Sequence, residues 1–246
     1  MTDHQGRSFG TVAGDYDRYR PGYPPEAVAW ALGERPLRVA DLGAGTGILS
    51  RLLHRLGHEV TAVEPDDRMR ARLAEASPDV AAVAGTAEEV PLPDGSVDAV
   101  VAGQAYHWFD PDRAHPEMAR VLRPGGRVVA MWNDCDLDTA WTVRLVELID
   151  GPDAVIHGRD GTDFGGYFGP VERAEFRHDL WTTPDDVLRL TTTRSPYIVA
   201  TPRGRRELLA AVRTLTGSGE LAGRDRFPMP HVTRVYRALS HRKVAA

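Results

Sequence analysis

Residues 39–47 read VADLGAGTG and place three glycines directly behind the carboxylate of Asp41. Glycine lets the backbone turn sharply and approach a ligand where any Cβ atom would clash. The dinucleotide pattern G-x-G-x-x-G needs a glycine at position 48, where this chain has Ile48, so a nicotinamide dinucleotide is disfavoured. A carboxylate beside the turn repels a pyrophosphate and suits a ligand that carries positive charge. We therefore expect a cationic cofactor on this turn.

A second acid, Glu64, ends the next apolar run. Doubly wound folds place an acid at this point, where it binds the two hydroxyls of a ribose. Together with the glycine turn, Glu64 predicts that the cofactor is a nucleoside.

His107 is the candidate for proton transfer, because it follows an apolar run at 97–103 that is expected to end near the reacting atoms. Histidine in water titrates near pH ~6.5, so it can take a proton from a hydroxyl or an amine. The alternative, a histidine packed beside Trp108 to shape the pocket, stays open. No metal site is expected among the other histidines.

Short apolar runs alternate with helix signals through the first half of the chain. The expected strands are 38–42, 59–64, 80–85, 97–103 and 127–132. The expected helices are 49–56, 66–76 and 111–123, the last with Asp110 as N-cap. Strands that are apolar along their whole length predict a parallel sheet covered on both faces, that is, a doubly wound α/β domain.

The second half departs from this alternation. An apolar face over Trp141, Leu145 and Ile149 predicts a helix, followed by a glycine-rich loop at 150–170. A sixth strand is expected at 176–182 and a seventh at 231–239. Between them we expect two helices, each opened by Thr-Pro, at 183–184 and 201–202. No clear linker divides the chain.

The composition sets the class of protein: 246 residues, 42% hydrophobic, 26% charged, with a net charge of -5. Acids are mixed among the bases, so we expect no nucleic-acid partner. No apolar run approaches the ~18–20 residues that span a bilayer. The single cysteine, Cys135, fits a reducing compartment. We expect a cytoplasmic protein without membrane association.

These motifs, in this order, make the sequence similar to the class I S-adenosylmethionine (SAM)-dependent methyltransferases. VADLGAGTG resembles their first motif, VEPDDRM (63–69) their acidic second loop, and LRPGGRVV (122–129) the turn before their fifth strand. More narrowly, F-x6-Y-x3-RPGYP at 9–24, with QAYHW at 104–108, resembles the branch that includes trans-aconitate methyltransferases and related small-molecule enzymes.

The resemblance implies SAM as cofactor, with S-adenosylhomocysteine (SAH) as product and no metal. It assigns the methionine end of the cofactor to Asp41 and to the backbone of Gly43, Ala44 and Gly45, and the ribose to Glu64.

By the same resemblance, Pro65 and Asp66 are expected to flank the adenine, and Thr86 and Ala87 to meet its edge and face. Many members have an aspartate where this chain has Thr86. Gln104 ends the fourth strand beside the cofactor.

Tyr16 and Arg20 fall in the N-terminal segment that closes over the pocket in this family, and Arg20 could pair with the methionine carboxylate. Their spacing of four places both on one face of a helix, where ordinary packing is the alternative role. The residues expected to line the substrate pocket are Trp108, Trp132, Asn133 and Arg194. For Trp108 a place in the core or the pocket wall is favoured over cation–π contact with the sulfonium, and for the other three surface or packing roles are equally open.

The sequence therefore predicts a Rossmann-like, seven-stranded, mostly parallel sheet with a helical cover over the active site. The whole chain, 1–246, is expected to be one methyltransferase domain, with a lid at 1–30, a cofactor-binding core at 35–135, and the cover with the last two strands at 136–246. It is expected to move a methyl group to an O or N atom of a small molecule, with a carboxylate or hydroxyl favoured. A non-catalytic SAM-binding protein and a nicotinamide-dependent oxidoreductase are the alternatives.

Overall fold

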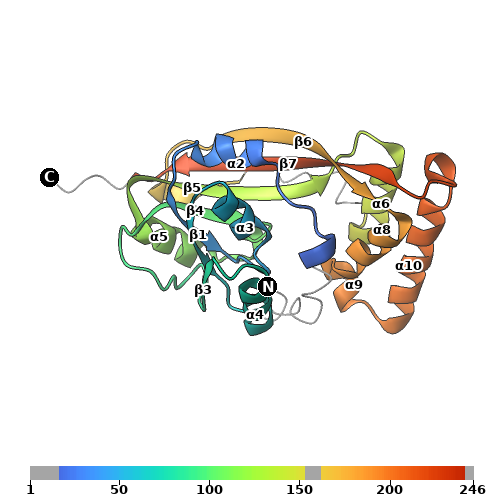
Figure 1. Ribbon diagram of the computed structural model, residues 1–246, viewed down its shortest axis with the longest axis horizontal. Helices are drawn as coiled ribbons and strands as arrows, with labels where there is room; N and C mark the ends of the chain where they lie inside the picture. The colour runs from blue at the N-terminus through green and yellow to red at the C-terminus, as the bar shows by residue number, and fades with distance from the viewer. Residues whose placement is uncertain (1–16, 153–161, 242–246) are drawn as a thin grey trace.

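A computed structural model of the chain describes residues 17–152 and 162–241. Its centre is a seven-stranded sheet of order β3-β2-β1-β4-β5-β7-β6 (Figure 1). The strands are β1 (Arg38–Leu42), β2 (Glu59–Val63), β3 (Ala81–Val83), β4 (Val97–Gly103), β5 (Leu122–Cys135), β6 (Glu172–Thr182) and β7 (Phe227–Leu239). The expected seven-stranded, doubly wound architecture is confirmed.

The first five strands run parallel, and the order of the chain reverses between β1 and β4. Val39 pairs with Ala99 and Asp41 with Val101, so the carboxyl ends of these two strands lie side by side. Ligands of open α/β sheets bind at such a reversal point. The topology therefore places Asp41 and the end of β4 at one edge of the sheet.

Helices cover both faces of this parallel half. On one face, α2 (Pro25–Leu32) and α3 (Ile48–Arg55) bury apolar side chains against the sheet, while α5 (Pro111–Val121) covers the other. The buried α3 leucines are Leu49, Leu52 and Leu53, as their spacing predicts. Leu56, expected on the same face, is 39% exposed because the helix ends at Arg55.

Polar caps begin several helices where the sequence predicts. The Asp110 side chain accepts from the N–H of Asp112 to begin α5, and Asp66 accepts from Arg68 and Met69 to begin α4 (Asp67–Ala76). These caps satisfy N–H groups that have no partner within the helix.

The cover is a helical cluster at one end of the long strands β5, β6 and β7 (Figure 1). Thr183 and Thr201 cap two of its helices, as expected. Its members are α6 (Ala140–Asp150), α8 (Pro184–Thr192), α9 (Ser195–Val199) and α10 (Pro202–Thr216). Helices α2 and α9 have no counterpart among the sequence predictions.

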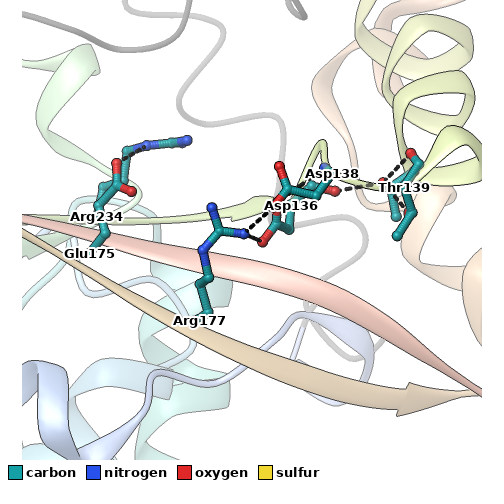
Figure 2. A network of polar contacts seen from close by, with 7 residues as sticks. Asp136, Asp138, Thr139, Glu175, Arg177 and Arg234 are labelled. Atoms are coloured by element: carbon teal, nitrogen blue, oxygen red, sulfur yellow. Dashed lines mark hydrogen bonds and ion pairs between the residues drawn. The ribbon is translucent and has the colours of Figure 1, made fainter.

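Strands β5, β6 and β7 are longer than their apolar runs predict. Strand β7 pairs antiparallel with both neighbours, from Arg127–Leu239 to Cys135–His231 on the β5 side. Beyond the apolar core this ribbon carries ion pairs (Figure 2): Arg177 with Asp136 and with Asp138, and Arg234 with Glu175. Strand β7 keeps its backbone pairing along this length, and its cover end also buries Phe227 and Met229 among the cover helices.

No helix in the described ranges, 17–152 and 162–241, is long and apolar enough to cross a membrane.

Candidate functional site

The glycine turn between β1 and α3 is built by backbone hydrogen bonds. The N–H groups of Gly43 and Ala44 both donate to the carbonyl of Val63, at 2.9 and 3.2 Å. A Cβ atom on Gly43 would lie 2.7 Å from the Cβ of Ala105, whereas one on Gly45 would meet nothing within 4 Å. Both glycines have positive φ, 66° and 59°. Gly43 therefore packs against Ala105, whereas the space beside Gly45 is free for a ligand.

Asp41 is buried at the end of β1, immediately before this turn. Its carboxylate accepts a hydrogen bond from Ser50 Oγ at 2.5 Å. Burial raises the pKa of Asp41 to about 7; the Ser50 bond opposes the rise, and the nearby Glu64 charge adds to it. A cation placed beside this carboxylate would restore its ionised form.

Glu64 lies at the end of β2 and is also buried. Gly45 N–H donates to Oε2 at 2.8 Å, and Asp66 N–H donates to Oε1 at 2.9 Å. Burial raises the pKa of Glu64, and these two hydrogen bonds oppose the rise. Each carboxylate oxygen keeps further acceptor capacity, which two ribose hydroxyls could use.

A pocket of about 470 Å³, including the solvent at its mouth, lies over the turn. It is lined by the turn itself, by the end of β4, and by the segment at 20–23. The hydroxyl of Thr46 is buried in this lining and makes no hydrogen bond. Buried polar groups are nearly always paired, so this orphaned hydroxyl indicates a site made for a ligand.

Gln104 is the one non-glycine residue with positive φ, 56°, in the part of the chain that the structure describes. Its N–H donates to the carbonyl of Met131 at 2.8 Å, and its Nε2 to the carbonyl of Asn133 at 2.6 Å. Such strained conformations concentrate at functional sites. Gln104 lines the pocket where β4 ends.

The predicted site residues divide into those that line this pocket and those that do not. Glu64 is not in the lining but contacts it through the hydrogen bond from Gly45 N–H. Those in the lining are Arg20, Asp41, Gly43, Ala44, Gly45, Gln104 and Asn133. Tyr16 lies outside the described residues.

The four residues expected around the adenine have local roles in the structure. Pro65 is exposed, and Asp66 caps α4. Thr86 makes an isolated bridge with Glu89, and Ala87 is buried in the core. Their contact with adenine stays a prediction.

His107 lies in the 3-10 turn η2 (Tyr106–Trp108), exposed and outside the pocket lining. Trp132 Nε1 donates to His107 Nδ1 at 3.4 Å, and the Trp108 ring lies tilted against the imidazole at 4.7 Å. Indole N–H is only a donor, so Nδ1 is the acceptor and the neutral ring carries its proton on Nε2. In this arrangement the basic lone pair of His107 faces Trp132.

The remaining predicted substrate residues differ in exposure. Trp108 is 41% exposed, whereas Trp132 is buried. Arg194 directly precedes α9 and forms an ion pair with Asp150 at the end of α6. Neither tryptophan nor Arg194 belongs to the described pocket lining.

Several residues at the site lack a sequence prediction, among them Tyr23, Thr46 and Ser50. Tyr23 is part of the RPGYP motif and Thr46 lies inside the glycine turn, so the sequence motifs could have indicated both as pocket residues. Ser50 reaches Asp41 from α3, and only the way the helix packs on β1 shows that contact.

No group of three or more histidine, cysteine or acidic side chains could hold a metal ion among the residues that the structure describes.

Comparisons with known proteins agree with this geometry. A profile described as a methyltransferase domain matches residues 40–130. An uncharacterized methyltransferase of Mycobacterium tuberculosis is 44% identical over 234 residues, which is 94% of this chain and 95% of the relative. The malonyl-[acyl-carrier protein] O-methyltransferase of Methylococcus capsulatus is 39% identical, over 50% of this chain and 49% of its own.

Solved structures share the fold. A protein of Anaeromyxobacter dehalogenans, provisionally assigned as a type II methyltransferase, superposes with a TM-score of 0.65 at 24% identity, covering 90% of this chain and 97% of that one. The phosphoethanolamine N-methyltransferase 2 of Haemonchus contortus, solved with SAH, superposes with a TM-score of 0.54 at 16% identity, covering 96% of this chain and 60% of its own. Fold and relatives together show that the chain belongs to the methyltransferase family.

Proposed function

We propose that the protein is a SAM-dependent methyltransferase that methylates an O or N atom of a small molecule. One arrangement carries the proposal: a buried Asp41, a glycine turn open at Gly45, and Glu64 bound to that turn. The orphaned Thr46 hydroxyl in the same pocket supports a resident ligand. Asp41 and the backbone of Gly43, Ala44 and Gly45 would hold the methionine end.

The other cofactor contacts follow the resemblance. Glu64 would bind the ribose, and Pro65, Asp66, Thr86 and Ala87 would surround the adenine. Arg20 and Gln104 line the pocket. Together with Tyr16 they would contact the methionine end of the cofactor. The chain would act as one domain, with lid 1–30, core 35–135 and cover 136–246, in the cytoplasm.

SAM supplies an electrophilic methyl group, and its in-line transfer removes the positive charge on sulfur. The chain contributes orientation and exclusion of water: the segment at 20–23 lies over the pocket, and Gln104 is held rigid at the end of β4. Trp108, Trp132, Asn133 and Arg194 would surround the acceptor.

His107 is needed as a base only when the acceptor must lose a proton. Its Nδ1 lone pair is engaged by Trp132, so accepting a proton there requires the long 3.4 Å bond to break. This arrangement favours an acceptor that is already ionised, such as a carboxylate. The resemblance to the trans-aconitate branch and the similarity to a malonyl-[acyl-carrier protein] O-methyltransferase support the same class.

Labelled SAM incubated with the protein and a metabolite extract of the source organism tests the function. We expect label in small molecules, and mild alkali should release it as methanol if the acceptor is a carboxylate. The Gly45→Ala variant serves as the control for background transfer. Label confined to macromolecules, or none above that control, would contradict the proposal.

A further inference from the structure

Asn133, near the end of β5, has a buried side chain whose polar atoms are all engaged. Its Nδ2 donates to the carbonyls of Pro21 and Gly22, at 3.2 and 2.9 Å. Its Oδ1 accepts a hydrogen bond from Thr233 on β7. Carbonyl groups cannot donate, so this orientation of the amide is the one that satisfies both sides. Both amide hydrogens are therefore committed to the N-terminal segment.

That segment, residues 17–23, is here called the strap. Its start is tied to the core, because Asp17 pairs with Arg51 of α3 at 2.5 Å and with Arg72 of α4 at 3.4 Å. Arg20 donates to the hydroxyl and the carbonyl of Thr193, next to the cover helices, at 3.1 and 2.9 Å. The strap thus runs from the core to the cover, and Asn133 ties its far end to the sheet.

The strap also forms one wall of the pocket, through Arg20, Pro21 and Tyr23. A ligand on the glycine turn lies beneath this wall. The two carbonyls that Asn133 holds belong to residues next to Arg20 and Tyr23 in the chain. Release of these carbonyls would remove the contact that ties this wall to the sheet.

We propose that Asn133 is a positioning residue: it holds the strap closed over the pocket and so limits how fast the cofactor enters and leaves. The identity of that cofactor rests on the proposed function. The backbone carbonyl of Asn133 accepts from Gln104 Nε2 at 2.6 Å, so truncation of the side chain leaves the Gln104 contact in place. Asn133→Ala therefore isolates the strap contact.

Trypsin cleavage after Arg18 measures strap opening in the ligand-free protein. Arg18 is exposed, and Arg20 resists trypsin because Pro21 follows it. Two lost hydrogen bonds should increase the cleavage rate of Asn133→Ala roughly 5–100-fold when opening is faster than cutting. Asn133→Asp, which points carboxylate oxygens at two carbonyls, should increase it further.

Thr233→Val is the matched control. It removes the other hydrogen-bond partner of the Asn133 amide but leaves both hydrogen bonds to the strap. The cleavage rate should therefore stay within about threefold of that of the unmodified protein, a smaller increase than the loss of two hydrogen bonds gives. Cooperative thermal unfolding of all three variants shows that cleavage reports local opening. Equal cleavage rates for Asn133→Ala and Thr233→Val would overturn the proposal.

Dissociation of SAH from the loaded protein provides the second measurement. Asn133→Ala should speed dissociation by the same factor as cleavage. Faster dissociation with unchanged cleavage of the ligand-free protein would overturn the proposal, because Asn133 would then act by touching the ligand. Failure of the unmodified protein to bind SAH would contradict the proposed function and leave the cleavage result valid.

Discussion

The backbone N–H of Gly45 donates a hydrogen bond to Oε2 of Glu64 across 2.8 Å, joining the turn after β1 to the end of β2. One carboxylate thus shapes the turn and, in the proposed complex, binds the ribose. Glu64→Ala should weaken SAH binding by about 1.5–3 kcal/mol, the range for hydrogen bonds to charged groups. Calorimetric titration measures this, with exposed Glu59→Ala at the start of β2 as control. An unchanged SAH affinity would remove Glu64 from the ribose site.

Gly45 and Gly219 form a matched pair for testing the pocket. Both have positive φ, 59° and 57°, and a Cβ on either would meet nothing within 4 Å. Alanine at each position should cost about 1–2 kcal/mol of folding free energy, because it enters the left-handed region. Gly45→Ala alone should also weaken SAH binding, roughly tenfold or more, since its methyl group occupies ligand space. Equal SAH affinity in the two variants would mean that the ligand lies elsewhere.

The raised pKa of Asp41, about 7, predicts a pH dependence of cofactor binding. Below this value Asp41 is protonated in the ligand-free protein, and pairing with an ammonium group requires it to ionise. SAH affinity should therefore increase with pH, by up to tenfold per unit, and level off above about 7. In Asp41→Asn this increase should disappear. A titration curve that is the same for both proteins would exclude Asp41 from the cofactor site.

The same ionisation affects folding. In the folded protein the pKa of Asp41 is about 7, above its usual value of 3.8. The contribution of Asp41 to the free energy of unfolding is therefore complete below pH 3.8 and is lost as the pH rises through about 7. Urea unfolding of the ligand-free protein across this range provides a check that needs no ligand, again with Asp41→Asn as the reference.

His107→Ala separates the two roles of the imidazole on the identified substrate. If the acceptor must lose a proton, kcat should decrease roughly 10²–10⁴-fold with SAH binding intact, and the acidic limb of the pH profile should vanish. If the acceptor is a carboxylate, KM should increase while kcat stays nearly independent of pH. The exposed His54→Ala is the control. A His107 variant that matches the unmodified protein in kcat, KM and pH dependence would place the residue outside the site.

Local signals predicted much of the core. Strand β4 has the bounds that its apolar run indicates, and Asp110 caps α5 as its position before Pro111 suggests. The glycine turn and Glu64 follow neighbouring parallel strands, which bring their carboxyl ends to one edge, but the hydrogen bond between them was not predicted.

Contacts between distant residues were the part that could not be predicted. The Asn133 bonds to Pro21 and Gly22 join residues more than a hundred positions apart, and no periodicity encodes them. The length of β5 depends on its partner β7, and the direction of the His107 lone pair depends on buried Trp132. The resemblance places Asp66 beside the adenine, which stays a prediction, and the structure adds that its side chain caps α4.

Calorimetric titration of the unmodified protein with SAM, SAH and NADH tests the central claim most directly. SAM and SAH should bind in the micromolar range or tighter, one molecule per chain, because Asp41, the open turn at Gly45 and Glu64 suit a nucleoside with a cationic tail. NADH should not bind, since the turn lacks the third glycine and places a carboxylate where a pyrophosphate would lie. Tight binding of NADH with no binding of SAM or SAH would contradict the assignment.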